Sequence, residues 1–219
     1  FPVLQMLYWT IIFPKNLFDL NTFQLFSNTI YLVFLSSIVL VVFSFISNYG
    51  NRVTKSKFLN FLTTFSITGY AIPGVILAVA FITFIAWFDN TFVKAFEFNS
   101  IKKIFIGSIF GLVIVYFIRF YSLAYNGLKT GYERINRSID ESSYLLGYSK
   151  IKTFLGIHVP YLKNSVFLIG ILITIEVIKE LPITLILRPF NFETFATTAY
   201  IFASQDLLEA AAVPSLFLI

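Results

Sequence analysis

Long uncharged stretches alternate with short charged segments along this chain. A helix needs about 20 mainly apolar residues to cross a bilayer. Four stretches are long enough to predict such a helix, namely residues 27–49, 58–88, 104–128 and 160–187. The apolar stretches 1–13 and 210–219 predict partial spans at the two ends. Runs of this length indicate helices, since the strands of a membrane barrel show a shorter, alternating pattern.

The uncharged stretch 58–88 is too long for one simple crossing. Pro73 and Gly74 in its middle predict a kink or a break, because proline lacks an N–H group and clashes with the preceding turn. Such a break is tolerated where the backbone lines a cavity or is buried in protein, and a kink that serves packing alone is the alternative. In the next stretch, the G-x-x-x-G spacing that begins at Gly107 predicts close helix approach. Arg119 is expected to extend toward the cytoplasmic interface.

Composition and charge place the chain in a membrane. Hydrophobic residues make up 58% of its 219 residues and charged residues only 12%, against about 25% charged residues in soluble domains. The net charge of +5 does not indicate nucleic acid as a partner, because the basic residues gather beside the apolar stretches. Residues 50–57 and 129–152 are rich in Lys and Arg, residues 89–103 have mixed charge, and residues 188–209 hold one basic and three acidic residues. The positive-inside rule therefore predicts that the first two segments are cytoplasmic and the other two external.

Several kinds of chemistry are excluded by what the sequence lacks. Without cysteine it can form neither a disulfide nor a thiolate metal site, and the single His158 cannot make a histidine metal cluster. It contains no G-x-x-x-x-G-K-S/T loop, so we do not expect it to bind ATP. No nucleophile–base pair suggests catalysis. We therefore expect a protein that is not an enzyme and that binds no cofactor or metal of its own.

The stretch from Ser138 to Pro160 is the longest polar-containing interruption between apolar spans. Ser138 and Glu141 have the spacing of a capping box, which predicts a helix start. Gly147 predicts the end of that helix in a left-handed turn, and Ser149 is placed to cap a second short helix. Pro160 would then lie in the first turn of the next apolar helix. We expect two short helices in a bend on the membrane surface.

This stretch resembles the EAA motif of permease subunits of binding-protein-dependent ABC importers. Glu141, Gly147, Ile157 and Pro160 keep the spacing of the motif, while serines stand in place of its two alanines and valine in place of its leucine. The resemblance implies that residues 137–157 form a cytoplasmic coupling helix that contacts an ATPase subunit. The residues implied in coupling are Asp140, Glu141, Ser142, Ser143, Tyr144, Leu145, Leu146, Gly147, Ile157 and Pro160. An interfacial loop that merely joins two spans is the alternative.

The side chains suggest how this contact would work. Tyr144, Leu145 and Leu146 would offer apolar surface to a groove of the partner. Asp140 and Glu141 would offer charge. Gly147 would permit the bend, and the next helix would start rigidly at its proline, so that it moves as a rigid body.

A second group of charged residues lies near the end of the stretch 160–187. Glu176 and Glu180 are four residues apart, which would place them on one helical face beside Lys179. Pro182 would break the helix and open a pore-lining turn. Ionisable groups inside a membrane usually face a partner or a wet cavity, so these carboxylates are predicted to line the route of a cation. A salt bridge at the outer interface is the alternative.

Two further segments extend the resemblance. The sequence GYAIPG at residues 69–74 resembles a Tyr-Ala-x-Pro-Gly sequence common in these permeases, and it adds Tyr70, Pro73 and Gly74 to the implied translocation pathway. The sequences KELP at residues 179–182 and LRPFNFET at residues 187–194 resemble ferric-iron permeases more narrowly. Oxygen ligands from Glu176, Glu180 and Tyr200 would suit a hard trivalent cation, but they would suit other cations as well.

The resemblance covers the whole chain and implies its architecture. It implies an all-α, polytopic transmembrane domain of the type I ABC importer kind, with about five to six spans and a cytoplasmic coupling helix. Residues 1–219 would be a single permease domain, a fragment from the second half of a longer chain in the bacterial inner membrane.

The same resemblance implies partners and cargo. The partners would be a cytoplasmic ABC ATPase dimer that binds the ATP, a periplasmic substrate-binding protein, a second permease half or identical subunit, and membrane lipid. Ferric iron is the implied cargo. A permease for thiamine, a polyamine or an oxyanion, a secondary transporter and a membrane scaffold are the alternatives.

Overall fold

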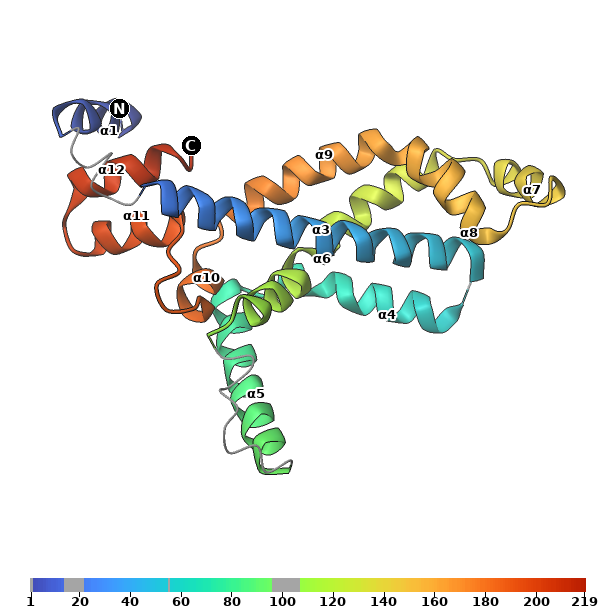
Figure 1. The fold of residues 1–219 in the computed structure, drawn as a ribbon, viewed down its shortest axis with the longest axis horizontal. Helices are drawn as coiled ribbons and strands as arrows, with labels where there is room; N and C mark the ends of the chain where they lie inside the picture. The colour runs from blue at the N-terminus through green and yellow to red at the C-terminus, as the bar shows by residue number, and fades with distance from the viewer. Residues whose placement is uncertain (1, 14–21, 55, 96–106) are drawn as a thin grey trace. The chain divides into compact units, whose positions relative to one another are not determined.

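The structure, a computed structural model, describes residues 2–13, 22–54, 56–95 and 107–219, and every regular element in these ranges is helical (Figure 1). In chain order the elements are α1 (Pro2–Ile12), α3 (Thr22–Thr54), α4 (Lys57–Ile67), η1 (Thr68–Ala71), α5 (Gly74–Ala95), α6 (Ile109–Glu133), α7 (Arg137–Leu145), α8 (Lys150–Thr153), η2 (Phe154–His158), α9 (Val159–Ile178), α10 (Pro182–Leu187), α11 (Phe195–Ser204) and α12 (Leu208–Leu216). Element η1 is a 3-10 turn and η2 a π-helical turn. The predicted all-α class is confirmed.

Three helices are long and apolar enough to cross a membrane. They are α3, α6 and the continuous helix Lys150–Ile178, which contains α8, η2 and α9. A fourth is gained if α4 with η1 and α5 are counted as one bent span. The partial spans expected at the two ends correspond to α1 and α12, whose 11 and 9 residues fall short of a crossing. The described residues therefore account for three or four of the five to six spans expected, and the polytopic membrane architecture is confirmed.

The predicted break at Pro73 is confirmed. The helical run of α4 and η1 ends at Ala71, and α5 begins at Gly74. In η1, Gly69 packs directly on α6, because a Cβ atom at this position would collide with the carbonyl oxygen of Ile118. A glycine is therefore required at Gly69 by the closeness of two backbones.

The stretch 160–187 is divided between two helices, so the break predicted at Pro182 is confirmed. Helix α9 ends at Ile178 and α10 begins at Pro182. Pro182 cannot donate a hydrogen bond to the carbonyl of Ile178, and its ring clashes with that carbonyl, so the helix stops there. A proline is well tolerated at the first position of a new helix, which explains why α10 starts at this residue.

Helix α11 lies in a segment that the charge pattern marked only as an external loop. Its start is fixed by a capping box in which Thr194 and Thr197 each bond the backbone N–H of the other. The threonine side chain at the third position does here what Glu or Gln does in the usual form of this motif. A search for capping boxes that accepts only Glu or Gln at the third position therefore misses the start of α11.

The close helix approach predicted at Gly107 is wrong. Gly107 has a φ of +66° and lies before α6 begins, so it cannot contribute to a helix face. A second pair with the same spacing, Gly127 and Gly131, makes the contact instead. A Cβ atom at Gly127 would lie 2.7 Å from Cγ1 of Ile169, and one at Gly131 would lie 2.7 Å from Cδ2 of Leu162, so α6 and α9 approach closely at these positions.

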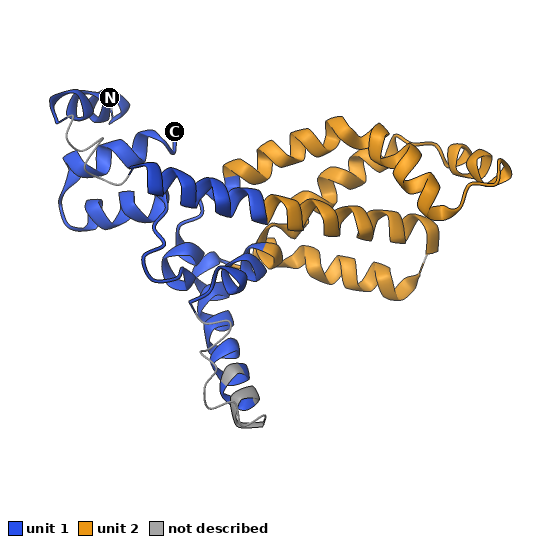
Figure 2. Cartoon of the chain, in the orientation of Figure 1, with its two compact units in different colours: residues 1–35, 73–116, 176–219 blue, residues 36–72, 117–175 orange. Residues whose placement is uncertain are grey.

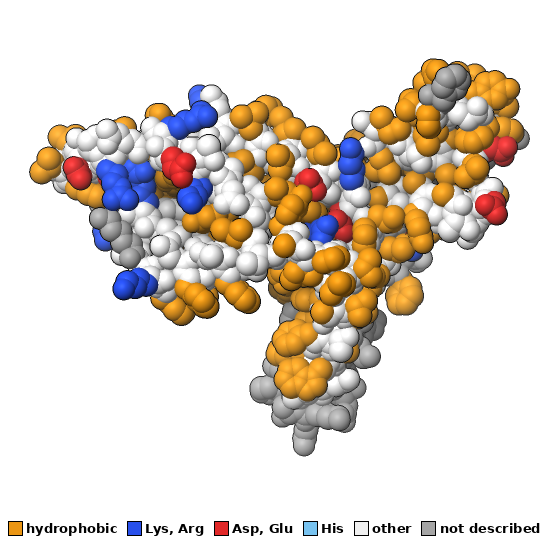
Figure 3. Space-filling model, turned by 180° about the vertical axis from the view of Figure 1, so that it is seen from behind, with side chains coloured by type: hydrophobic (Ala, Val, Ile, Leu, Met, Phe, Trp, Pro, Cys, Tyr) orange, Lys and Arg blue, Asp and Glu red, His pale blue; other side chains and the backbone are white. Residues whose placement is uncertain are grey.

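By their internal contacts, the residues form two compact units (Figure 2). Unit 1 comprises residues 1–35, 73–116 and 176–219, and within it α11 packs on α12, α12 on α1, and α10 on α5. Unit 2 comprises residues 36–72 and 117–175. On the face drawn in Figure 3, several Lys and Arg side chains gather over the end of unit 2 that carries α7 and α8. Whether the chain is one permease domain remains a prediction.

The contact at Gly69 provides a test of the packing of η1. We expect Gly69→Ala to destabilise the protein by about 1–3 kcal/mol, since the obstacle is a backbone carbonyl that cannot rotate away. Gly170→Ala is the matched control, because nothing lies within 4 Å of the added methyl group in α9. The thermal unfolding midpoint of the two purified variants in detergent checks this. Equal midpoints would show that η1 does not pack on α6 as described.

Candidate functional site

The first helix of the central stretch starts two residues earlier than the capping box predicts. Asn136 is the N-cap of α7, and its side-chain oxygen accepts a hydrogen bond from the N–H of Ser138 at 3.2 Å. The predicted cap at Ser138 with Glu141 is therefore wrong. Asparagine is at least as good an N-cap as serine, and here it precedes serine in the chain. Glu141 remains on the exposed surface of α7.

The end of α7 is as predicted. Gly147 has a φ of +80°. Its N–H donates to the carbonyl of Tyr144 at 3.0 Å, and the N–H of Tyr148 donates to the carbonyl of Ser143 at 3.0 Å. These two bonds form a Schellman motif, in which a left-handed residue satisfies the last carbonyls of a helix. The bend after α7 therefore depends on Gly147.

The second helix begins where expected but does not end as a separate short helix. The side chain of Ser149 accepts from the N–H of Lys152, which confirms the predicted cap. The helix then continues through the π turn η2 into α9, with the N–H of Val159 bonded to the carbonyl of Phe154. Pro160 thus lies inside a continuous helix and does not start a new one. A π turn is one of the ways in which a helix accommodates a residue that interrupts its ladder.

Asp140 faces the interior and not a partner. Its Oδ2 atom lies 2.6 Å from Nε of Arg52, which comes from the end of α3. The other guanidinium nitrogens donate to the carbonyls of Tyr132 at 3.2 Å, Ile135 at 2.9 Å and Asn136 at 3.1 Å. Arg52 therefore ties α3 to the turn between α6 and α7. The expectation that Asp140 offers its charge to a partner is wrong, because its carboxylate is buried and paired within the chain.

His158 completes this buried group. Its Nε2 atom lies 2.9 Å from Oδ1 of Asp140, and its side chain is fully buried. The imidazole sits between two phenol rings, with centroids 5.2 Å from Tyr49 and 5.4 Å from Tyr132. The hydroxyl of Tyr49 donates to the carbonyl of Lys150 at 2.6 Å. We call Arg52, Asp140 and His158 the buried charged cluster. It joins α3, α7 and the helix Lys150–Ile178.

Ser143 strengthens the same junction. Its hydroxyl lies 2.8 Å from that of Thr153 on α8, and it also donates to the carbonyl of Asp140 at 2.8 Å. Both hydroxyl side chains are buried. A small side chain is therefore needed here for packing within the chain itself.

The opposite side of α7 is exposed and apolar. Leu145 and Leu146 are 89% and 78% exposed, and Glu141, Ser142 and Tyr144 are also on the surface. A cavity of about 470 Å³ lies beside these residues, and four coupling candidates line it, namely Ser142, Ser143, Leu146 and Ile157. The structure thus places four of the ten predicted coupling residues around one hollow, and Asp140 is not among them.

The second predicted group has a different geometry from the one expected. Because α9 ends at Ile178, Glu180 lies outside the helix and does not share a helical face with Glu176. The Oε1 atom of Glu180 accepts from the N–H of Ile183 at 3.2 Å, and its carbonyl accepts from the hydroxyl of Thr184 at 2.6 Å. Buried Glu180 therefore holds the first turn of α10. Glu176 is half-buried, and Lys179 is exposed.

The break before Pro73 is stabilised by Arg119. Its Nη1 atom donates to the carbonyl of Ile72 at 2.7 Å. Arg119 was expected to extend to the membrane interface, and this expectation is wrong because the broken helix provides a nearer acceptor. Tyr70 is partly exposed, whereas Gly74 is buried. Tyr70 belongs to unit 2 and the other implied pathway residues to unit 1.

The segment after α10 forms a closed loop. Arg188 forms an ion pair with Glu193, which also accepts a hydrogen bond from the hydroxyl of Thr197 at 2.9 Å. Asn191 has a φ of +60°, and Phe190 at the tip is 99% exposed. Tyr200 lies half-exposed on α11. Within the described ranges, no group of three or more His, Cys, Asp or Glu side chains is arranged to hold a metal ion.

Sequence reasoning missed the buried charged cluster. It used Arg52 only to assign the cytoplasmic side and His158 only to exclude a metal site. A usable signal was present, because a basic, an acidic and a histidine residue all fall at the same predicted membrane face. Buried charges usually occur in pairs, so these three were candidates for mutual contact.

The buried charged cluster predicts a stability difference between adjacent acids. We expect Asp140→Asn to lower the free energy of unfolding by about 3 kcal/mol, because it leaves the largely buried guanidinium of Arg52 uncompensated. Glu141→Gln on the exposed face should change it by less than about 0.5 kcal/mol. Thermal unfolding of both purified variants in detergent measures the difference. An equal effect of the two substitutions would refute an internal role for Asp140.

Comparison with known proteins supports the resemblance to an iron permease. No family model matches the chain. Over 216 residues, 97% of its length, the chain is 22% identical to the Fe(3+)-transport system permease protein FbpB 2 of Haemophilus influenzae, and it spans 40% of the length of that protein. The chain also has three helices long and apolar enough to span a membrane. The predicted resemblance is thus confirmed: this is an all-α membrane chain that resembles the permease subunits of ABC iron importers.

Proposed function

We propose that this chain is the membrane-spanning permease part of an ATP-driven importer and that α7 receives the movement of a separate ATPase subunit. The two-sided character of α7 carries the proposal. Leu145 and Leu146 are exposed on one side, while Asp140 and Ser143 are buried on the other. A helix that only joined two spans would gain nothing from large apolar side chains left exposed without a partner, since burying a leucine is worth about 1.5–3 kcal/mol.

The hollow beside α7 supports a docking role. Leu146, Ile139, Tyr148 and Ile157 give it apolar walls, and Ser142 adds a hydroxyl. A partner side chain placed there would contact both α7 and the π turn η2. Docking would therefore act on two elements of unit 2 together.

The buried charged cluster explains how a push on α7 reaches the spans. Asp140 holds α7 to Arg52 at the end of α3 and to His158 in the helix Lys150–Ile178. Breaking a buried ion pair costs about 3–5 kcal/mol. A force on the exposed face therefore moves these helices together as a rigid body before it separates them.

Ferric iron is the cargo that we propose. The support is the Fe(3+) in the name of the similar permease, together with the KELP and LRPFNFET segments. A periplasmic binding protein would deliver the iron, and ATP would be hydrolysed on the ATPase. Since the carboxylate of Glu180 already accepts a hydrogen bond from the first turn of α10, half-buried Glu176 is the better candidate for a carboxylate on the cation route. Uptake of radiolabelled ferric iron into proteoliposomes, in competition with thiamine, a polyamine and an oxyanion, tests this assignment.

Gly147 allows coupling to be tested without altering the docking side chains. We expect Gly147→Leu to reduce ATP-dependent uptake at least tenfold, because a leucine is strained at a φ of +80° and would displace the end of α7. A Cβ atom there would meet nothing within 4 Å, so the effect comes from the backbone and not from a collision. Radiolabelled iron uptake by proteoliposomes that contain the permease, its ATPase and its binding protein measures it.

Gly147→Asn is the matched control. Asparagine adopts the left-handed conformation more readily than other residues with a side chain. This variant should keep most of the uptake. Normal transport by Gly147→Leu would contradict the coupling role of α7, and equal loss in both variants would contradict its dependence on the left-handed turn.

A further inference from the structure

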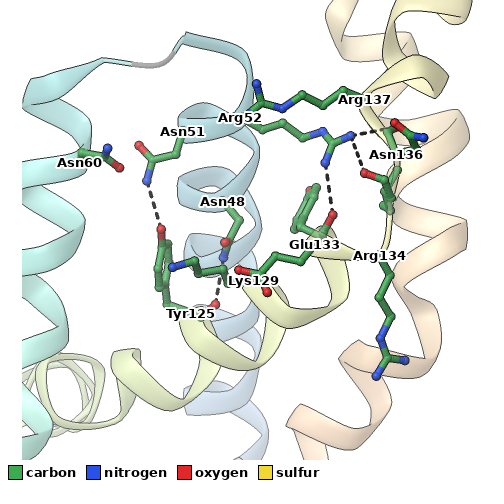
Figure 4. Close-up of a pocket in the computed structure, with 12 residues that line it drawn as sticks. Asn48, Asn51, Arg52, Asn60, Tyr125, Lys129, Glu133, Arg134, Asn136 and Arg137 are labelled. Atoms are coloured by element: carbon green, nitrogen blue, oxygen red, sulfur yellow. Dashed lines mark hydrogen bonds between the residues drawn. The ribbon is translucent and has the colours of Figure 1, made fainter.

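Unit 2 contains a second, more polar cavity of about 630 Å³ (Figure 4). It is lined by residues of α3, α4 and α6, by the turn between α6 and α7, and by Arg137 at the start of α7. Four basic, one acidic and four asparagine side chains contribute to its wall. The cavity shares no residue with the hollow beside α7, so the proposed docking of an ATPase leaves it unexplained.

The cavity carries an excess of positive charge. The positive charge of Arg52 is compensated by Asp140. Three further basic residues line the cavity, and among the lining residues only Glu133 is available to balance their charge. In Figure 4, Lys129 lies alongside Tyr125, Arg137 extends over Arg52, and Arg134 points away from them. Lys129 and Arg137 are therefore the cations best placed for an anion in the cavity. Arg137 is also the first residue of α7, and a helix start adds positive partial charge.

The asparagines add a defined hydrogen-bonding pattern. The side-chain nitrogen of Asn48 donates to the carbonyl of Tyr125 at 3.1 Å. That of Asn51 donates to the hydroxyls of Thr63 and Tyr125, each at 3.2 Å. The Oδ1 atom of Asn51 is buried and accepts no hydrogen bond from the described residues. A buried acceptor of this kind favours a ligand that brings a hydroxyl donor.

The cavity lies where the apolar helices become charged. In α3 the first charged residue is Arg52, after an uncharged run from Thr22. In α6 the charged residues Lys129 and Glu133 follow an apolar run interrupted only by Arg119. This is the level at which lipid headgroups lie, and basic pockets between spanning helices at that level bind anionic headgroups.

We propose that this cavity binds the headgroup of an anionic phospholipid. Lys129 and Arg137 hold the phosphodiester, and a hydroxyl of a headgroup such as that of phosphatidylglycerol donates to Oδ1 of Asn51. The bound headgroup lies against Arg52 and so braces the turn between α6 and α7. Lipid occupancy thereby stabilises the base on which α7 rests. This inference does not depend on the cargo or on the ATPase.

Lipid titration of the purified chain tests the proposal. In a neutral detergent, phosphatidylglycerol should raise the thermal unfolding midpoint in a saturable manner, whereas phosphatidylcholine should not. Phosphatidic acid, whose headgroup has no glycerol hydroxyl, should bind more weakly than phosphatidylglycerol at a pH where its phosphate is fully ionised. The double variant Lys129→Gln/Arg137→Gln should need at least tenfold more phosphatidylglycerol for the half-maximal shift.

Lys150→Gln/Lys152→Gln is the matched control. It removes the same charge from exposed positions on α8, outside the cavity, and it should leave the lipid response unchanged. Equal weakening by both double variants would overturn the proposal, since it would show attraction by the overall charge. Protection by inorganic phosphate at the same concentration would also overturn it, because the site would then belong to a free anion and not to a lipid.

Discussion

The contact between Arg52 and Asp140 is the interaction on which the cytoplasmic part of this structure depends. The guanidinium donates hydrogen bonds to one carbonyl in the last turn of α6 and to two carbonyls after it, and the carboxylate anchors α7 while it also contacts His158. Two charges removed from water are stable only when they are paired and hydrogen-bonded. The geometry satisfies that condition with groups from four separate helices. The apolar face of α7 can therefore remain exposed, because its opposite face is fixed.

Three prolines interrupt the long helices, and each interruption is satisfied in a different way. At Pro73 the helix breaks, and Arg119 donates to the carbonyl of Ile72. At Pro160 the helix continues through a π turn. At Pro182 one helix ends and another begins, with Glu180 accepting from its first turn. In each case a backbone group that would be costly to leave unpaired in a membrane obtains a partner.

The sequence was sufficient for features that depend on local chemistry. The long apolar runs predicted the spanning helices, Gly147 predicted a left-handed turn, and Ser149 predicted a cap. Features that depend on tertiary contacts were not accessible in the same way. The pattern showed Asp140 as one of two adjacent acids on a surface helix, and nothing local distinguishes it from Glu141. Its burial follows from Arg52, which is 88 residues away in the chain.

The same distinction applies to the other corrections. Glu176 and Glu180 have helical spacing, but Pro182 ends the helix at Ile178, so only Glu176 is helical. Gly107 and Gly127 both begin a G-x-x-x-G pattern, and only the second lies on a helix that has a close neighbour. A sequence motif indicates which residues could contact another helix. Which of them make the contact depends on the helices that pack beside them.

Site-specific crosslinking tests the role of α7 most directly. The chain has no cysteine, so Leu145→Cys introduces a single thiol on the exposed face, and Leu207→Cys introduces one in the predicted external segment before α12. In membranes that contain the ATPase and the binding protein, we expect a thiol-specific photocrosslinker at position 145 to capture the ATPase and one at position 207 not to do so. Capture of the ATPase from position 207 alone, or from neither position, would contradict the coupling role of α7.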